Sequence, residues 1–186
     1  MKIIIGSVGY LSAGKETFYG AISPDRSIPR IIIGDIVRAE VKRQGLEVNV
    51  ENMEYVSELL RQQTGNRIMR IAEGEIRKQF KTADLLFIDS IRDPQDRQTL
   101  LEYADSVKTL AICASAEIRY ARMLNRGREG DPKTLEEFVK KSETREKCVG
   151  DLITSADYTI ENEATVESFT QEAQVLWKII MGDLKK

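Results

Sequence analysis

The stretch GYLSAGKET, residues 9–17, follows directly after the apolar run KIIIGSV near the start of the chain. It contains the pattern Gly-x-x-x-x-Gly-Lys, which is typical of a loop that wraps round phosphate oxygens between a strand and a helix. Glycines let the backbone N–H groups face the phosphates, and the following helix adds partial positive charge. The pattern therefore predicts a nucleotide phosphate site at Gly9, Ser12, Ala13, Gly14 and Lys15.

The residue after Lys15 departs from the usual pattern. Glu16 stands where a Ser or Thr hydroxyl normally contacts Mg²⁺. Either Glu16 ligates the ion, for example through a water molecule, or Thr17 contributes from the next position. A third interpretation makes Glu16 an acidic residue in the first turn of a helix, stabilised by the helix dipole. Glu16 and Thr17 are thus candidates for both nucleotide and metal binding.

Composition narrows the class of protein. The 186 residues are 41% hydrophobic and 31% charged, which predicts one soluble globular domain, residues 1–186. A net charge of -2 offers no broad attraction to nucleic acid or to an anionic membrane. The apolar runs are too short to cross a bilayer, and no signal peptide is visible. We expect a cytoplasmic protein whose partners are small-molecule nucleotide substrates. The sequence leaves open whether the chain forms a homo-oligomer.

Histidine is absent from the chain. Its absence excludes Ser-His-Asp and Cys-His nucleophile systems and removes a common zinc ligand. Cys113 and Cys148 lie far apart without metal-ligand spacing, so we expect reduced thiols rather than a disulfide. Phosphoryl transfer is a reaction class that needs little beyond positioning and positive charge.

Short β-branched runs alternate with helical patterns, which predicts an α/β fold: a five-stranded parallel sheet in a three-layer α/β/α arrangement. The expected strands are 2–8, 30–33, 84–88, 107–113 and 156–160. The expected helices after the first are 35–44, 51–63, 66–80, 115–127, 132–147 and 165–184.

The segment DLLFIDSIRD places an aspartate, Asp89, at the end of the third expected strand. The carboxyl ends of strands line the ligand crevice in an open parallel sheet. An aspartate there suits the Mg²⁺ coordination shell, so Asp89 is a candidate catalytic and metal-binding residue.

Arginines gather in the segment YARMLNRGREGDP. Arg122 and Arg126 are four residues apart and share one helical face, and Arg128 follows in a glycine-rich segment. Guanidinium groups on a closing lid could neutralise a transferring phosphoryl group and exclude water. The alternative interpretation is a solvated basic helix end. We expect the lid over residues 119–147, with these three arginines as catalytic candidates.

A second group of charged residues lies between the second and third expected strands, where an acceptor could bind. It comprises Asp35, Arg38, Arg61, Arg67 and Arg70, with Arg92 just beyond Asp89. The alternative for each arginine is a surface ion pair.

These segments, together with ADYTIENEATVESF near the end of the chain, occur in the order found in one group of kinases. From residue 2 to about 176 the chain resembles the P-loop nucleoside and nucleotide kinases. It is nearest to dephospho-CoA-kinase-like proteins and to a mainly archaeal group of predicted nucleotide kinases. The resemblance implies these matches: Gly9, Gly14 and Lys15 for the phosphate loop, Asp35 and Arg38 for the acceptor region, Asp89 and Arg92 for an "IDGIR"-like segment, Arg122, Arg126 and Arg128 for the lid, and Asn162 for the loop that covers the base.

One residue and one segment depart from the pattern of the family that the chain resembles. Ser90 stands where glycine is usual. Relatives also have a longer helix after the phosphate loop, whereas FYGAISPDRSIPR contains Gly20, Pro24 and Pro29, so the first helix should stop near Ile22. A short first helix would shorten one wall of the active site.

The expected activity is Mg²⁺-dependent transfer of the ATP γ-phosphate to a nucleotide or nucleotide-like acceptor, with ATP and Mg²⁺ as cofactors. A hydroxyl acceptor points to dephospho-CoA or a nucleoside, with Asp35 as a candidate base. A phosphate acceptor points to a nucleoside monophosphate and needs no base. The alternative is an NTP-binding regulatory protein or slow ATPase without a second substrate.

Overall fold

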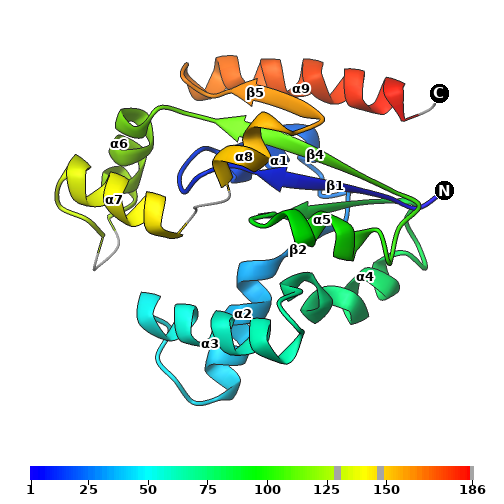
Figure 1. Ribbon diagram of the computed structural model, residues 1–186. Coiled ribbons are helices and arrows are strands. Elements are labelled where there is room, and N and C mark those ends of the chain that lie inside the picture. Colours follow the sequence, from blue (N-terminus) through cyan, green and yellow to red (C-terminus); the bar gives the residue numbers. More distant parts are fainter. Residues whose placement is uncertain (128–130, 146–148, 185–186) are drawn as a thin grey trace. The chain divides into compact units, whose positions relative to one another are not determined.

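The computed structural model describes residues 1–127, 131–145 and 149–184. Its strands form a five-stranded parallel sheet in the order β2-β3-β1-β4-β5, with helices on both faces (Figure 1). The predicted α/β fold class is therefore confirmed. Backbone contacts divide the chain into unit 1, residues 1–6 and 28–108, and unit 2, residues 7–27 and 109–186. The single-domain organisation stays a prediction.

Unit 1 contains the first part of β1 (Ile3–Val8) and a set of short elements. These are β2 (Arg30–Ile32), α2 (Ile33–Arg43), α3 (Val50–Gln63), the 3₁₀ helix η1 (Ile68–Ala72), α4 (Glu73–Gln79), β3 (Leu85–Asp89) and α5 (Pro94–Leu100). Helices α2 and α3 pack side by side through Val37, Val41 and Val56 (Figure 1). As predicted, α2 stops before a glycine: Gly45 has φ 72°, and the next N–H bonds back to the Val41 carbonyl.

Residues 66–80 differ from the prediction of one continuous helix. The structure has the 3₁₀ helix η1 followed by α4. Ile68, Met69 and Ala72 of η1 are buried, and η1 contacts α2, α3 and α5. Apolar spacing over five residues cannot separate a 3₁₀ from an α turn, so packing against several partners decides the local geometry. Helix α5 is likewise unpredicted, because seven residues carry too little periodicity to detect.

Unit 2 contains the end of β1 and most of β4 (Ser106–Cys113), which also begins in unit 1. Its other elements are α1 (Lys15–Ile22), α6 (Ala116–Arg126), α7 (Leu135–Arg145), α8 (Val149–Thr154), β5 (Tyr158–Glu161) and α9 (Val166–Asp183). As predicted, α1 ends at Ile22. It packs against α9, where the rings of Phe18 and Phe169 lie 6.5 Å apart (Figure 1).

Two further observations concern membrane-spanning helices and the cysteines. Within the three described ranges, no helix is long and apolar enough to cross a membrane. Cys113 is a half-buried free thiol, and burial raises its pKa. Cys148 lies outside the described residues.

Candidate active site

The predicted phosphate loop joins β1 to α1 in unit 2. Its backbone needs glycine at two points, because Gly9 has φ 152° and Gly14 has φ 106°. A Cβ atom at Gly9 would overlap the carbonyl oxygen of Ile112. The Lys15 ammonium donates to the carbonyls of Gly9 at 2.7 Å and Tyr10 at 2.9 Å. The lysine is thus folded back over the loop that precedes it.

Glu16 and Thr17 follow in the first turn of α1. Glu16 is exposed and Thr17 is half-buried. A carboxylate in this turn interacts favourably with the helix dipole whether or not it meets a metal. Both metal assignments therefore stay predictions.

The lid region begins with α6, where the first arginine is buried. Arg119 donates from Nε to the Ala114 carbonyl at 3.1 Å. Its guanidinium lies over two rings, 4.8 Å from the centre of Tyr10 and 5.3 Å from that of Phe138. Since Tyr10 belongs to the predicted phosphate loop and Phe138 to α7, this cation–π stack joins the loop to α6 and α7, which fall in the region of the predicted lid. A solvated helix end does not describe Arg119.

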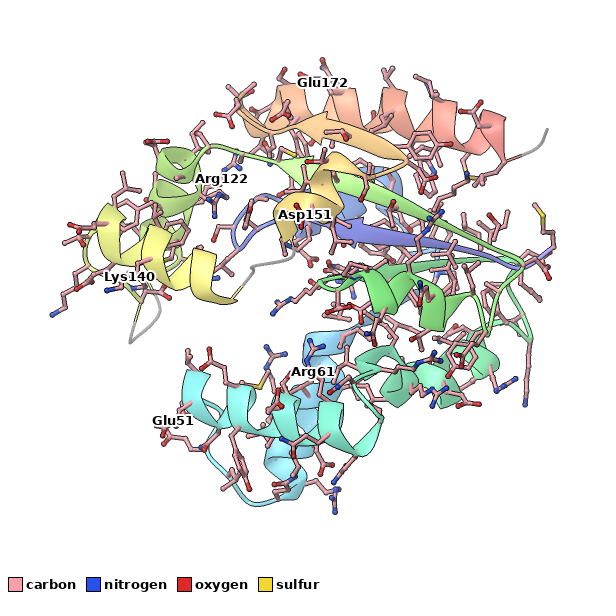
Figure 2. The ribbon with its side chains drawn as sticks, in the orientation of Figure 1. Glu51, Arg61, Arg122, Lys140, Asp151 and Glu172 are labelled. Atoms are coloured by element: carbon pink, nitrogen blue, oxygen red, sulfur yellow. The ribbon has the colours of Figure 1, made fainter. Side chains whose placement is uncertain are left out.

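The three predicted lid arginines have different surroundings. Arg122 donates from Nη2 to the side-chain oxygen of Asn162 at 2.9 Å, so the structure brings these two predicted residues together. Arg126 pairs with Asp131 at 3.2 Å. Arg128 lies outside the described residues. Figure 2 shows Arg122 projecting from α6.

In unit 1, Asp89 ends β3 as predicted and is buried. Its carboxylate accepts a 2.5 Å hydrogen bond from Arg30, at the start of β2. Arg30 is not among the residues predicted from the sequence, because nothing in its neighbourhood marks it. The next residue, Ser90, has φ 72°, a backbone conformation that glycine adopts more readily than serine.

The predicted acceptor residues are largely engaged in ion pairs with one another or with nearby acids. Asp35 pairs with Arg38 one turn away on the exposed side of α2. Arg67 and Arg70 both pair with Glu102. These contacts agree with the surface-ion-pair alternative, although they leave an acceptor role for Asp35 and Arg38 a prediction.

A buried carboxylate, Asp96, bonds to the backbone of Arg92 and is influenced by the charge of Arg61. Its Oδ2 accepts backbone N–H groups from Arg92 at 2.9 Å and Asp93 at 3.0 Å. Burial raises the pKa of Asp96, and these two hydrogen bonds, followed by the charge of Arg61, partly oppose that rise. Figure 2 shows Arg61 projecting from α3. The capping sequence at Asp93 could have indicated the helix start, but no sequence signal places Arg61 near it.

Comparisons with known proteins complete the description. No family model matches the chain. A UPF0200 protein of Hyperthermus butylicus is 32% identical over 183 residues, which cover 97% of this chain and 96% of the relative. Shikimate kinase from Bacteroides thetaiotaomicron superposes with a TM-score of 0.58 at 14% identity, over 95% of this chain and 98% of that one.

Dephospho-CoA kinase from Campylobacter jejuni superposes with a TM-score of 0.57 at 16% identity, over 98% of this chain and all of that chain. At such identities the two solved structures establish a shared fold, in agreement with the resemblance inferred from the motifs. The relative from H. butylicus is similar over nearly its full length. The chain therefore belongs to the UPF0200 family and has the fold of the P-loop kinases.

Proposed function

We propose that this protein is a phosphotransferase that moves the γ-phosphate of Mg²⁺-ATP to a nucleotide or nucleotide-like acceptor. The observation that carries the proposal is the loop between β1 and α1. Its positive φ angles at Gly9 and Gly14 and its folded Lys15 side chain are what a cradle of N–H groups beside an ammonium requires. Such a cradle at a helix N-terminus binds phosphate oxygens.

The charge around the loop suits phosphoryl transfer, which is catalysed mainly by positioning and electrostatic stabilisation. Lys15 would bind the β- and γ-phosphates. Arg122 and Arg126 would neutralise charge that spreads over the transferring group, and Arg128 belongs to the same expected set. The chain has no histidine, and this reaction needs none. Asn162 and the loop residues Ser12 and Ala13 would complete the nucleotide site.

The available oxygen donors fit Mg²⁺ held mainly by water and phosphate. Magnesium usually takes one or two protein ligands and keeps several water molecules. In the described ranges, no group of three or more His, Cys, Asp or Glu side chains could hold a metal alone. Glu16, Thr17 and Asp89 are the residues that would hold the ion or its waters. When bound, Mg²⁺ neutralises phosphate charge during transfer.

The proposed acceptor-binding residues belong to unit 1. Arg38, Arg61 and Arg92 have the planar donor geometry that recognises phosphate. A nucleoside monophosphate would need no base, whereas a hydroxyl acceptor of the dephospho-CoA type could use Asp35. The solved structures named as shikimate kinase and dephospho-CoA kinase support the reaction class, and they do not choose between these acceptors.

The experiment is an ADP-release assay with Mg²⁺-ATP and a panel of nucleoside monophosphates, nucleosides and dephospho-CoA. We expect at least one acceptor to raise ADP formation well above the rate with ATP alone. Binding of ATP should be measured in parallel by calorimetry. If ATP binds and no acceptor raises ADP formation, the kinase proposal fails and an NTP-binding regulator or slow ATPase replaces it.

A further inference from the structure

Asn162 is a buried residue directly after β5 that forms hydrogen bonds in three directions. Its backbone N–H donates to the Cys113 carbonyl at 2.7 Å. Its side-chain nitrogen donates to the Ala13 carbonyl at 2.8 Å. Its side-chain and backbone oxygens both accept from Nη2 of Arg122, at 2.9 and 3.0 Å. One amide thus joins a strand end, the phosphate loop and a lid helix.

The contact with the loop is close enough to restrict the loop backbone. Gly14 has φ 106°, and a Cβ atom built on it would overlap the side-chain nitrogen of Asn162. The amide therefore packs directly against the turn that leads into α1. The Ala13 carbonyl accepts a hydrogen bond from this amide, so the turn is anchored to the residue that directly follows β5.

The contact with Arg122 leaves one nitrogen of the guanidinium unused. Among the residues that the structure describes, the buried Nη1 atom has no hydrogen-bond partner. Burial lowers the pKa of Arg122, although the carboxylate of Glu163 opposes the effect. A buried guanidinium N–H is satisfied best by an anionic oxygen. In this structure Nη1 is covered by protein, and the guanidinium is held in place by the contacts of Nη2 with Asn162.

We infer that Asn162 is a positioning residue that holds the Ala13 carbonyl and the Arg122 guanidinium together, so that Arg122 keeps a fixed place relative to the loop that would bind an anionic phosphate. This role differs from the expectation that Asn162 belongs to the loop covering the base. It rests on the proposed function only for the identity of the anion. The link between the loop and the lid helix is a property of the chain itself.

The first test measures the link without nucleotide. Amide hydrogen exchange is followed in residues 9–17 of the wild type, Asn162→Leu and Asn162→Asp. Leucine removes all side-chain hydrogen bonds at similar volume, and aspartate replaces only the donor to Ala13. We expect exchange in the loop to rise about tenfold in both variants, because a buried carbonyl loses its donor. Asn125→Asp, an exposed change on α6, is the control and should exchange as the wild type does.

The second test measures coupling to Arg122. Affinity for the β,γ-imido analogue of ATP is determined by calorimetry for Asn162→Leu, Arg122→Gln and the double variant. Each single change should weaken binding about tenfold. The loss of affinity in the double variant should be much smaller than the product of the two single losses, because both changes remove the same contact. If Asn162→Leu does not fold, the same cycle is run with Asn162→Ala, which also removes the side-chain contact with Arg122.

The outcomes of these tests distinguish the positioning role of Asn162 from the proposed kinase function. Unchanged loop exchange in both Asn162 variants, or fully multiplicative losses of affinity, would overturn the positioning role even for an active kinase. Faster loop exchange in the Asn162 variants than in the wild type, together with a wild type that binds no nucleotide, would support the link and refute the proposed function.

Discussion

Arg30 donates a 2.5 Å hydrogen bond to Asp89, which lies 59 residues further along the chain, and their side chains are only 9% and 8% exposed. The strand register explains the contact. Arg30 pairs with Phe87 on β3, so Arg30 and Asp89 are diagonal neighbours on one face of the sheet. The candidate metal-binding carboxylate therefore has a buried countercharge of its own.

Removing one member of this pair should destabilise the protein strongly, because the other charge stays buried. We expect Arg30→Met to lower the free energy of unfolding by about 3–5 kcal/mol. The double variant Arg30→Met, Asp89→Leu should recover much of that loss. Urea denaturation followed by circular dichroism measures both. A loss below about 1 kcal/mol in Arg30→Met would show that the pair is not a buried charge contact.

Gly14→Ala should disrupt the phosphate loop. The substitution places a Cβ at φ 106° and against the amide of Asn162, so we expect a loss of about 1–2 kcal/mol in stability and loss of ATP binding. Gly20→Ala is the matched control, because its Cβ meets nothing within 4 Å inside α1. That variant should gain up to about 1 kcal/mol. If the two variants behave equally in thermal denaturation and ATP calorimetry, the assignment of Gly14 to a strained turn of the phosphate loop is contradicted.

Lys15→Ala should remove phosphoryl transfer. The ammonium is held at the loop by the carbonyls of Gly9 and Tyr10, and the loss of one transition-state donor lowers the rate by about a hundredfold or more. Lys178→Ala changes an exposed lysine on α9 and should leave the rate unaltered. The measurement is steady-state ADP formation with the acceptor found in the panel. Retained activity in Lys15→Ala would remove this loop from the mechanism.

Glu16→Thr distinguishes the two metal assignments. Glu16 is exposed in the first turn of α1, and we expect the variant to bind Mg²⁺-ATP within about threefold of the wild type, the scale of a lost dipole interaction. Thr17→Val should weaken the Mg²⁺ dependence of binding instead. Both are measured by titrating Mg²⁺ at fixed ATP. A large loss in Glu16→Thr alone would identify the carboxylate as the ligand.

Asp96 should make stability fall as pH rises above its ordinary pKa of 3.8, because burial raises the pKa of this carboxyl in the folded protein. Between 3.8 and that raised value the folded chain binds more protons than the unfolded chain, so the stabilising contribution is full at lower pH and is lost as pH rises. Asp96→Asn keeps an oxygen for the two N–H donors and cannot ionise.

The free energy of unfolding should therefore shift in favour of Asp96→Asn as pH rises through this window. Asp84→Asn is the control of opposite sign, since Lys2 lowers the pKa of Asp84. Urea denaturation at several pH values measures both differences. A wild-type and Asp96→Asn difference that is constant with pH would contradict the role of burial.

Local sequence by itself determines the elements that carry the phosphate loop. The apolar run before Gly9 predicts β1, the glycine and lysine pattern predicts the loop, and Gly20 with Pro24 predicts the end of α1 at Ile22. Each of these features acts within a few residues, through backbone sterics or missing N–H donors.

Tertiary structure alone decides which side chains meet. The 3₁₀ helix η1 replaces part of an expected α-helix because Ile68 and Met69 pack against several elements at once. Asn162 reaches Ala13 across 149 residues, and Arg30 reaches Asp89 through the register of two strands. No local pattern encodes these contacts, because they depend on strand pairing and burial that arise only when distant segments pack together.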